Sequence, residues 1–371
     1  MIEVNRMPRD AIASAGTHFL IGLKPSPVLD DHDRALLSSL RPAGVILFKS
    51  NFRHDLPYEA WLESHARLIA DIRAATGRER MLIAIDNEGG RVCRTPPPLT
   101  RFAYAARWAE HSAEVGRAMG RELSSLGINL NFAPVLDIHT NPDNPVIGPR
   151  AFGTTPEAVI AAALPFIEAM QAEKVLACGK HFPGHGDTSI DSHLGLPSQT
   201  LGLDGLRARE LKPFAAAIKV GLSMIMTSHI LYPSIDPDNP VTLSHRFLTG
   251  ILREELGYEG VAVSDDIGMG AMKGVFDKPE SAVRLLESGC DMVMVCAHFT
   301  DSGRAKGFAQ AIVAAINEGR LDPGILARSK ARIEALLDRA ATNEVELLPE
   351  SIFRAHAGIG ALYEAATVEV I

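Results

Sequence analysis

The chain has 371 residues, of which 46% are hydrophobic and 22% are charged, a balance typical of a globular enzyme with a large core. Its 37 basic and 45 acidic residues leave a net charge of −8, which argues against nucleic acid as a partner because nucleic-acid binding favours a basic face. A few placed arginines would still suffice to bind a small acidic substrate.

The N-terminal segment carries Glu3, Arg6, Arg9 and Asp10, and no apolar run precedes a small-residue cleavage site. A secretory signal peptide needs such a run. No stretch of about 18 apolar residues predicts a transmembrane helix. We therefore expect a cytoplasmic protein with no membrane partner.

Eight short apolar runs alternate with longer segments of helical periodicity. Most runs are continuous rather than alternating, as expected of strands buried on both faces in a parallel sheet. The runs are His18–Leu23, Gly44–Phe48, Met81–Ile85, Ile128–Pro134, Val175–His181, Leu222–Thr227, Gly260–Ser264 and Cys290–Val295. The predicted helices are Pro57–Ala75, Ala109–Leu126, Pro156–Ala172, Leu206–Val220, His245–Leu256, Pro279–Ser288, Gly307–Glu318 and Pro323–Ala340.

This alternation predicts the α/β class and, more narrowly, a single-domain (β/α)8 TIM-type barrel. We place the barrel at residues 1–341. Residues 342–371 are expected to be a C-terminal extension that packs on the barrel or is partly disordered. Cys178, Cys290 and Cys296 stand in apolar stretches and are expected to be core residues, because the four cysteines match neither a metal finger nor a disulfide framework.

Polar and glycine-rich residues follow most of the apolar runs. In a barrel of this type the chemistry lies at the C-terminal ends of the strands. The sequence therefore predicts that these stretches meet at one end of the barrel. They include Asp86–Arg91, Pro134–Asp137, Lys180–Asp187, Ser228-His229 and Ser264–Asp266.

The densest of them, KHFPGHGDTSIDSH, covers Lys180–His193 and allows three interpretations. It could bind a metal ion, because it holds five candidate ligands: His181, His185, Asp187, Asp191 and His193. It could carry out acid–base chemistry, with Asp191 orienting the imidazole of His193 for proton transfer. It could also be a structural loop whose histidines bond to backbone carbonyls.

Single residues at the other strand ends leave similar alternatives. Asp265 could be a nucleophile, a metal ligand or a helix N-cap. Asp86 suits hydrogen bonding to sugar hydroxyls, whereas either Arg91 or Arg94 could brace the loop by a salt bridge. Arg150 closes a turn-rich loop and could bind substrate or tie that loop down.

His229 could line the same pocket or be a hydrogen-bonded structural histidine. The sequence favours neither.

Taken together, these stretches resemble glycoside hydrolase family 3, and in particular its single-domain bacterial β-N-acetylglucosaminidases. Seven motifs occur in the family's order between about residue 17 and residue 300. They are ILFKSNF, IDNEGGRV, NLNFAPVLDI, NPVIGPRAFG, GKHFPGHGDTSIDSH, MTSHI and AVSDDIGM. One departure is Asn87, which stands where glutamine or histidine is often found.

The resemblance implies a role for each matching residue. Asp265 matches the nucleophile, and His193 matches a general acid/base that Asp191 orients. Sugar-hydroxyl ligands are implied at five positions: Asp86, Arg94, Arg150, Lys180 and His181. Under these roles no metal and no cofactor are needed.

The resemblance also implies a retaining exo-β-N-acetylglucosaminidase that forms a covalent glycosyl-aspartate intermediate. Its implied substrate is a small carbohydrate, a β-N-acetylglucosaminide. The implied natural source is cell-wall fragments that carry GlcNAc-1,6-anhydroMurNAc, including muropeptides, which the enzyme would cleave during peptidoglycan recycling. We expect a monomer. The alternatives are a β-glucosidase or xylosidase of the same family, an N-acetylglucosamine phosphorylase, a metal hydrolase that chelators inactivate, and, outside the enzymes, a sugar-binding barrel.

Overall fold

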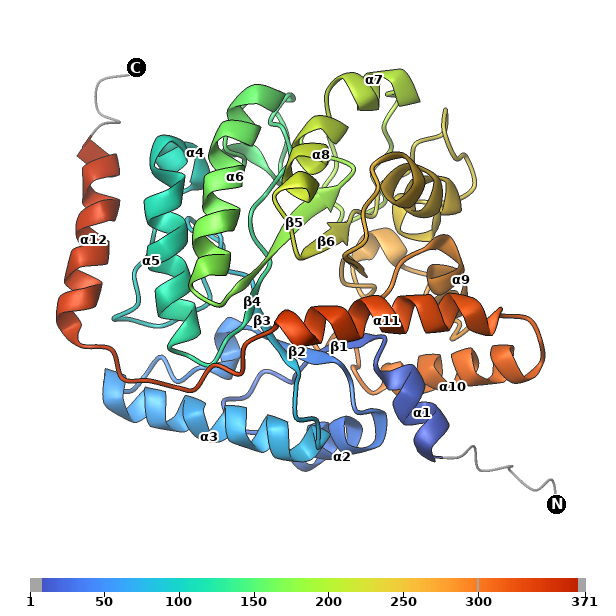
Figure 1. The fold of residues 1–371 in the computed structure, drawn as a ribbon, viewed down its shortest axis with the longest axis horizontal. Helices are drawn as coiled ribbons and strands as arrows, with labels where there is room; N and C mark the ends of the chain where they lie inside the picture. The colour runs from blue at the N-terminus through green and yellow to red at the C-terminus, as the bar shows by residue number, and fades with distance from the viewer. Residues whose placement is uncertain (1–8, 299, 366–371) are drawn as a thin grey trace.

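The computed structural model describes residues 9–298 and 300–365 and contains one eight-stranded parallel sheet. Its strands are β1 (Phe19–Gly22), β2 (Gly44–Leu47), β3 (Leu82–Ile85), β4 (Leu130–Asn131), β5 (Leu176–Phe182), β6 (Met224–Thr227), β7 (Val261–Ser264) and β8 (Val293–Cys296). Neighbours in the chain are neighbours in the sheet, and β1 also pairs with β8. The N–H of Ser264 donates to the carbonyl of Met292 over 2.9 Å, which brings β7 to β8 and closes the ring. The chain is therefore a (β/α)8 TIM-type barrel (Figure 1).

Every residue of the eight strands is buried, as continuous apolar runs predict. Successive side chains point to opposite faces of a strand. Leu20 and Ile46 accordingly belong to the cluster that fills the barrel, whereas Phe19, Ile21 and Val45 pack outward against the helices. The two cores hold the strands in place, so their C-terminal ends form a rigid platform.

Helices surround the barrel (Figure 1). They are α1 (Arg9–Gly16), α2 (Asp31–Leu40), α3 (Tyr58–Thr76), α4 (Ala105–Trp108), α5 (Ser112–Ser124), α6 (Pro156–Ala172), α7 (Leu203–Ala208), α8 (Leu211–Lys219), a π-helix (Arg246–Glu255), α9 (Ser281–Ser288), α10 (Arg304–Asn317), α11 (Pro323–Arg339) and α12 (Glu350–Ala365).

The predicted helix Leu206–Val220 is two helices, α7 and α8, so the expectation of a single helix is wrong there. Pro213 favours the division, because proline has no N–H to donate and disrupts a helix interior, whereas the first turn of a helix accepts it at little cost. It is the third residue of α8. Helix α2 has no counterpart among the predicted helices; it starts where Asp30 accepts a hydrogen bond from the N–H of Asp33.

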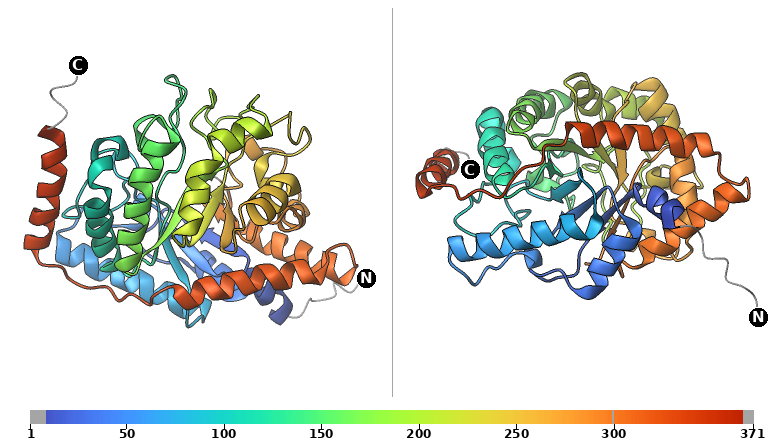
Figure 2. Two further views of the ribbon diagram at one scale, coloured as in Figure 1. Left: turned by 45° about the horizontal axis from the view of Figure 1, so that its top comes forward. Right: turned by 60° about the horizontal axis from the view of Figure 1, so that its bottom comes forward.

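The C-terminal part of the chain closes the end of the barrel at which the strands begin. Helix α11 lies across that end (Figure 2), and its Ile333, Leu336 and Leu337 join the cluster inside the barrel. The opposite end stays open. Within residues 9–298 and 300–365, no helix has the length and the apolar character that crossing a membrane requires.

Candidate active site

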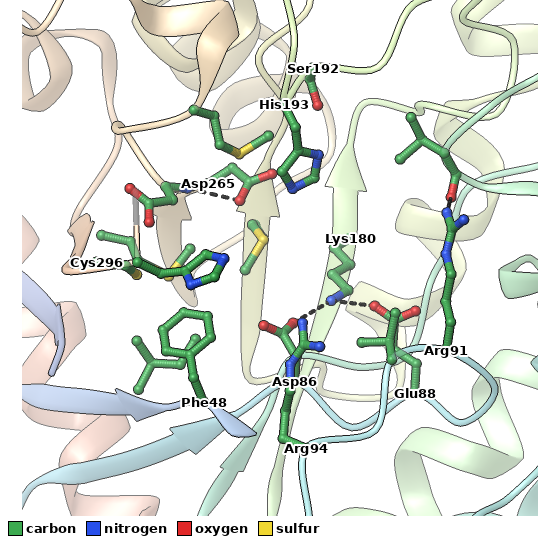
Figure 3. Close-up of a pocket in the computed structure, with 18 of the residues that line it drawn as sticks. Phe48, Asp86, Glu88, Arg91, Arg94, Lys180, Ser192, His193, Asp265 and Cys296 are labelled. Atoms are coloured by element: carbon green, nitrogen blue, oxygen red, sulfur yellow. Dashed lines mark hydrogen bonds and ion pairs between the residues drawn. The ribbon is translucent and has the colours of Figure 1, made fainter. Parts of the chain in front are cut away.

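The loops that follow the strands surround a cavity of about 920 Å³ at the open end of the barrel. All eight residues that the sequence singles out for catalysis or substrate binding line it (Figure 3 labels Asp86, Arg94, Lys180, His193 and Asp265). They are Asp86, Arg94, Arg150, Lys180, His181, Asp191, His193 and Asp265. These residues come from four separate stretches of the chain, and the barrel brings them to one place.

Asp265 directly follows β7 and extends into the cavity (Figure 3). Its Oδ1 accepts a hydrogen bond of 2.8 Å from the N–H of Asp266. Burial opposes ionisation of this carboxyl group, but the nearby imidazoles of His229 and His181 and the bond from Asp266 outweigh it and lower the pKa of Asp265. The group is therefore an ionised carboxylate at neutral pH, the state that nucleophilic attack requires.

His193 and Asp191 form a hydrogen-bonded pair at the cavity mouth. The Nδ1 atom of His193 lies 2.8 Å from Oδ1 of Asp191, and that oxygen also accepts from the N–H of His193 over 2.9 Å. These bonds outweigh the effect of partial burial and lower the pKa of Asp191. Nδ1 is engaged by the carboxylate, so proton transfer would use Nε2, and Figure 3 shows the ring beside Asp265.

The cavity floor carries a cluster of buried charges. Nζ of Lys180 lies 2.7 Å from Oδ1 of Asp86 and 2.6 Å from Oε1 of Glu88. Arg150 donates through Nε and Nη2 to the two oxygens of Glu88, each over 2.8 Å. Burial disfavours the charged form of each group, but the opposite charges prevail: they lower the pKa of Glu88 and raise the pKa values of Lys180 and Arg150.

His181 is fixed by a second buried carboxylate. Its Nδ1 lies 2.7 Å from Oδ2 of Asp137, and Oδ1 of Asp137 accepts the N–H groups of His181 (3.0 Å) and His185 (2.7 Å). Burial would raise the pKa of Asp137, but the two histidines and these bonds lower it. Asp137 thus holds the ring of His181 so that its other edge faces the cavity.

The five candidate metal ligands of the Lys180–His193 stretch separate to different partners. Nδ1 of His185 bonds to Thr188 and its Nε2 bonds to Ser192. The carboxylate of Asp187 bonds to Arg209, whereas His181 and His193 bond to the aspartates already described. Within the described residues, the one group of three ligands close enough to share an ion is Asp30, His32 and Asp33 at the start of α2. The geometry favours the acid–base interpretation over the metal-site interpretation.

Comparison with known proteins places the chain in a family. Residues 23–336 match the model of the glycosyl hydrolase family 3 N-terminal domain. A β-hexosaminidase of Methylococcus capsulatus is 37% identical over 336 residues, which cover 88% of this chain and 94% of that protein. The chain therefore belongs to glycosyl hydrolase family 3. It is a glycoside hydrolase with the barrel that the sequence predicts.

Solved structures of family 3 enzymes share this barrel. A family 3 β-N-acetylglucosaminidase from Paenibacillus sp. superposes with a TM-score of 0.85 at 34% identity, over 94% of this chain and 68% of that one. NagZ from Neisseria gonorrhoeae, solved with N-trifluoroacetyl-D-glucosamine, gives a TM-score of 0.75 at 30% identity, over 93% of this chain and 98% of that one.

The structure shows the contacts of the single residues for which the sequence left alternatives. Arg91 and Arg94 both line the cavity, and Arg91 also braces the loop by donating to the carbonyl of Val146. Arg150 does both, since it lines the cavity and binds Glu88. His229 is a buried structural histidine that bonds to Thr242 and to the carbonyl of Asp266.

Three further features of the site had no predicted role. Glu88 and Asp137 stand at strand ends that the sequence predicts to carry chemistry, and each lies three residues beyond an apolar run. Their position was a usable signal, but each of their partners described above is at least 44 residues away. The third feature is the stacked pair of Phe48 and His298, whose rings lie 5.5 Å apart at the cavity wall.

Proposed function

We propose that this family 3 enzyme is a retaining exo-β-N-acetylglucosaminidase. The observation that carries the proposal is the pairing of Asp191 with His193 beside Asp265, because it combines an ionised carboxylate with a positioned proton donor. The β-hexosaminidase of Methylococcus capsulatus and the Paenibacillus β-N-acetylglucosaminidase support the choice of sugar. The charged floor of the cavity suits one terminal sugar, whose hydroxyls would bind Asp86, Lys180 and Arg150. Arg94 and His181 would contact the same sugar from the cavity wall.

In the first step the carboxylate of Asp265 attacks the anomeric carbon of that sugar. A bond forms between Oδ of Asp265 and the carbon as the bond to the leaving oxygen breaks. His193, protonated at both ring nitrogens, gives the Nε2 proton to the leaving oxygen. The aglycone departs as a neutral alcohol, and a covalent glycosyl-aspartate with a neutral imidazole remains.

In the second step the neutral His193 takes a proton from a water molecule. The water oxygen bonds to the anomeric carbon, and the carboxylate of Asp265 leaves with the electron pair of the ester bond. Two displacements at one carbon retain the β configuration. Asp191 keeps Nδ1 of His193 protonated throughout, so that Nε2 alone exchanges the proton.

We further propose that the natural substrates are cell-wall fragments bearing GlcNAc-1,6-anhydroMurNAc, and that the enzyme is a cytoplasmic monomer acting in peptidoglycan recycling. The match to NagZ of Neisseria gonorrhoeae, solved with N-trifluoroacetyl-D-glucosamine, supports the N-acetylglucosamine unit of these fragments.

The decisive experiment measures hydrolysis of p-nitrophenyl β-N-acetylglucosaminide and of the corresponding β-glucoside, each with and without phosphate and with and without EDTA. The proposal predicts turnover of the N-acetyl sugar alone, unaffected by either addition. Preference for the glucoside would overturn the substrate, and strong stimulation by phosphate would make the enzyme a phosphorylase. Loss of activity in EDTA would revive the metal-site interpretation.

A further inference from the structure

The C-terminal helix α12 lies beside α5 on the outside of the barrel (Figure 1), beyond residue 336, where the family match ends. Two of its side chains face the barrel: Phe353 is buried, and the side chain of His356 is 15% exposed. Each begins a chain of contacts that ends on residues 95–104, the segment between Arg94 and α4.

The first chain of contacts runs through a buried carboxylate. Nδ1 of His356 lies 2.7 Å from Oε1 of Glu122 on α5. The same carboxylate accepts the N–H of Thr100 over 2.8 Å and its hydroxyl over 2.6 Å. Because the side chain of Glu122 is only 4% exposed, three donors from two segments replace water around it. Glu122 thus fastens Thr100 to α5, and His356 fixes Glu122.

The second chain of contacts is aromatic. The ring of Phe353 meets the ring of Tyr58 edge to face, with centroids 5.3 Å apart. Tyr58 in turn contacts Trp61 at 5.3 Å, and Nε1 of Trp61 donates to the carbonyl of Pro97 over 2.9 Å. Two independent routes from α12 therefore reach the same segment, at Pro97 and at Thr100.

That segment supports the cavity wall directly. The carbonyl of Phe102 accepts a hydrogen bond of 2.8 Å from the N–H of Gly90. A Cβ atom on Gly90 would overlap the ring of Tyr104, and one on Gly89 would lie 2.3 Å from the carbonyl oxygen of Ala103. Both glycines also have positive φ angles. The segment can therefore shift only if the Gly89-Gly90 turn shifts with it.

The residues on either side of this turn face the substrate cavity. Glu88 precedes the turn, Arg91 follows it directly and Arg94 joins the turn to residues 95–104; all three line the cavity. We propose that α12 positions the β3–α4 loop for substrate binding, with His356 and Phe353 as positioning residues that never touch the sugar. This inference rests on the proposed function, because that function identifies the ligand as a β-N-acetylglucosaminide.

The test compares His356→Ala with two matched variants. Arg354→Ala alters the same helix at an exposed residue that contacts the helix itself, and His356→Asn keeps a side-chain N–H near the place of Nδ1. With p-nitrophenyl β-N-acetylglucosaminide we expect His356→Ala to raise KM about three- to tenfold while kcat stays within about twofold. His356→Asn should recover most of the wild-type KM, and Arg354→Ala should match wild type. A merely structural role would lower stability without this separation of KM from kcat.

Hydrogen–deuterium exchange of residues 88–104 in the same intact variants provides a readout that does not depend on the substrate. We expect faster exchange in His356→Ala and in Phe353→Ala than in wild type or Arg354→Ala. Unchanged exchange and unchanged KM in both α12 variants would overturn the inference. If the wild type failed to cleave the hexosaminide, the proposed function would fail instead, and the exchange data would still decide whether α12 holds the loop.

Discussion

Nδ1 of His193 lies 2.8 Å from Oδ1 of Asp191, and the two residues stand two positions apart on one loop. Because the same Asp191 oxygen also accepts the N–H of His193 over 2.9 Å, the loop itself fixes the imidazole relative to the carboxylate. Gly184 and Gly186 precede the pair, and Gly184 has a φ angle of 148° that other residues rarely adopt. The proton donor thus stands on a loop, whereas the nucleophile directly follows β7.

Replacing the proton donor should affect substrates according to their leaving groups. We expect His193→Ala to lower kcat about 10²- to 10⁴-fold for an alkyl β-N-acetylglucosaminide, whose leaving oxygen needs a proton. For a p-nitrophenyl glycoside the loss in the first step should be much smaller, because the phenolate leaves unprotonated. Steady-state and pre-steady-state rates of both substrates measure the difference. Equal losses in that first step would show that His193 is not the acid.

Removal of the nucleophile should abolish turnover without unfolding the barrel. Asp265→Ala should leave no hydrolysis above background for either substrate, because the carboxylate that forms the ester is removed. Circular dichroism and thermal unfolding would confirm that the variant is folded. As a control, Asp301→Ala removes an exposed carboxylate after β8 and should retain activity. Appreciable activity of Asp265→Ala would refute the assignment.

The ion cluster under the cavity should contribute to stability as well as binding. Lys180→Met leaves Asp86 without its cation and removes one partner of the buried Glu88, so we expect a loss of about 3 kcal/mol in the free energy of unfolding. Urea denaturation measures it. The exposed pair of Arg67 with Glu63 provides the contrast, since Arg67→Ala should cost less than about 1 kcal/mol.

Acid should destabilise the protein through Glu88. The cations of Arg150 and Lys180 outweigh burial and lower the pKa of Glu88 in the folded state. A group with a lowered folded pKa contributes stability above its unfolded pKa and loses that contribution as pH falls toward the folded pKa. Below about pH 4.5, near the ordinary pKa of glutamate, stability should therefore fall more steeply in wild type than in Glu88→Gln. Parallel curves from urea titrations at several pH values would contradict this account.

Asp266 should have the opposite dependence on pH. Burial raises its pKa to about 7, so the folded protein holds a proton there that the unfolded chain has already released. Its contribution to stability is fully present below about pH 4 and is lost as pH rises toward 7. Asp266→Asn, which stays neutral, should stabilise the protein relative to wild type by an amount that grows from pH 4 to 7 and then levels off. A constant difference across that range would show that Asp266 titrates normally.

The sequence predicted the barrel and the places where its chemistry lies because both are local properties. Continuous apolar runs identify strands buried on both faces, and the polar residues directly after them mark one end of the barrel. The structure confirms the barrel and brings all eight predicted residues to one cavity.

Interactions between distant segments could not be predicted in this way. Arg150 and Glu88 are 62 residues apart, and His356 and Glu122 are 234 apart. Periodicity carries no information about which buried charges will pair across such separations. For the same reason the sequence predicted one helix where the structure has α7 and α8. Arg209, which lies between the two helices, bonds to Asp187, a contact between segments that helical periodicity does not reveal.

The most direct test of the central claim follows the configuration of the released sugar. Proton NMR spectra recorded within the first minutes of hydrolysis of a β-N-acetylglucosaminide, before mutarotation, identify the first anomer formed. Two displacements through an ester of Asp265 predict that the β anomer is released first and that the α anomer appears only later by mutarotation. Initial release of the α anomer would mean a single displacement by water and would contradict the nucleophilic role of Asp265.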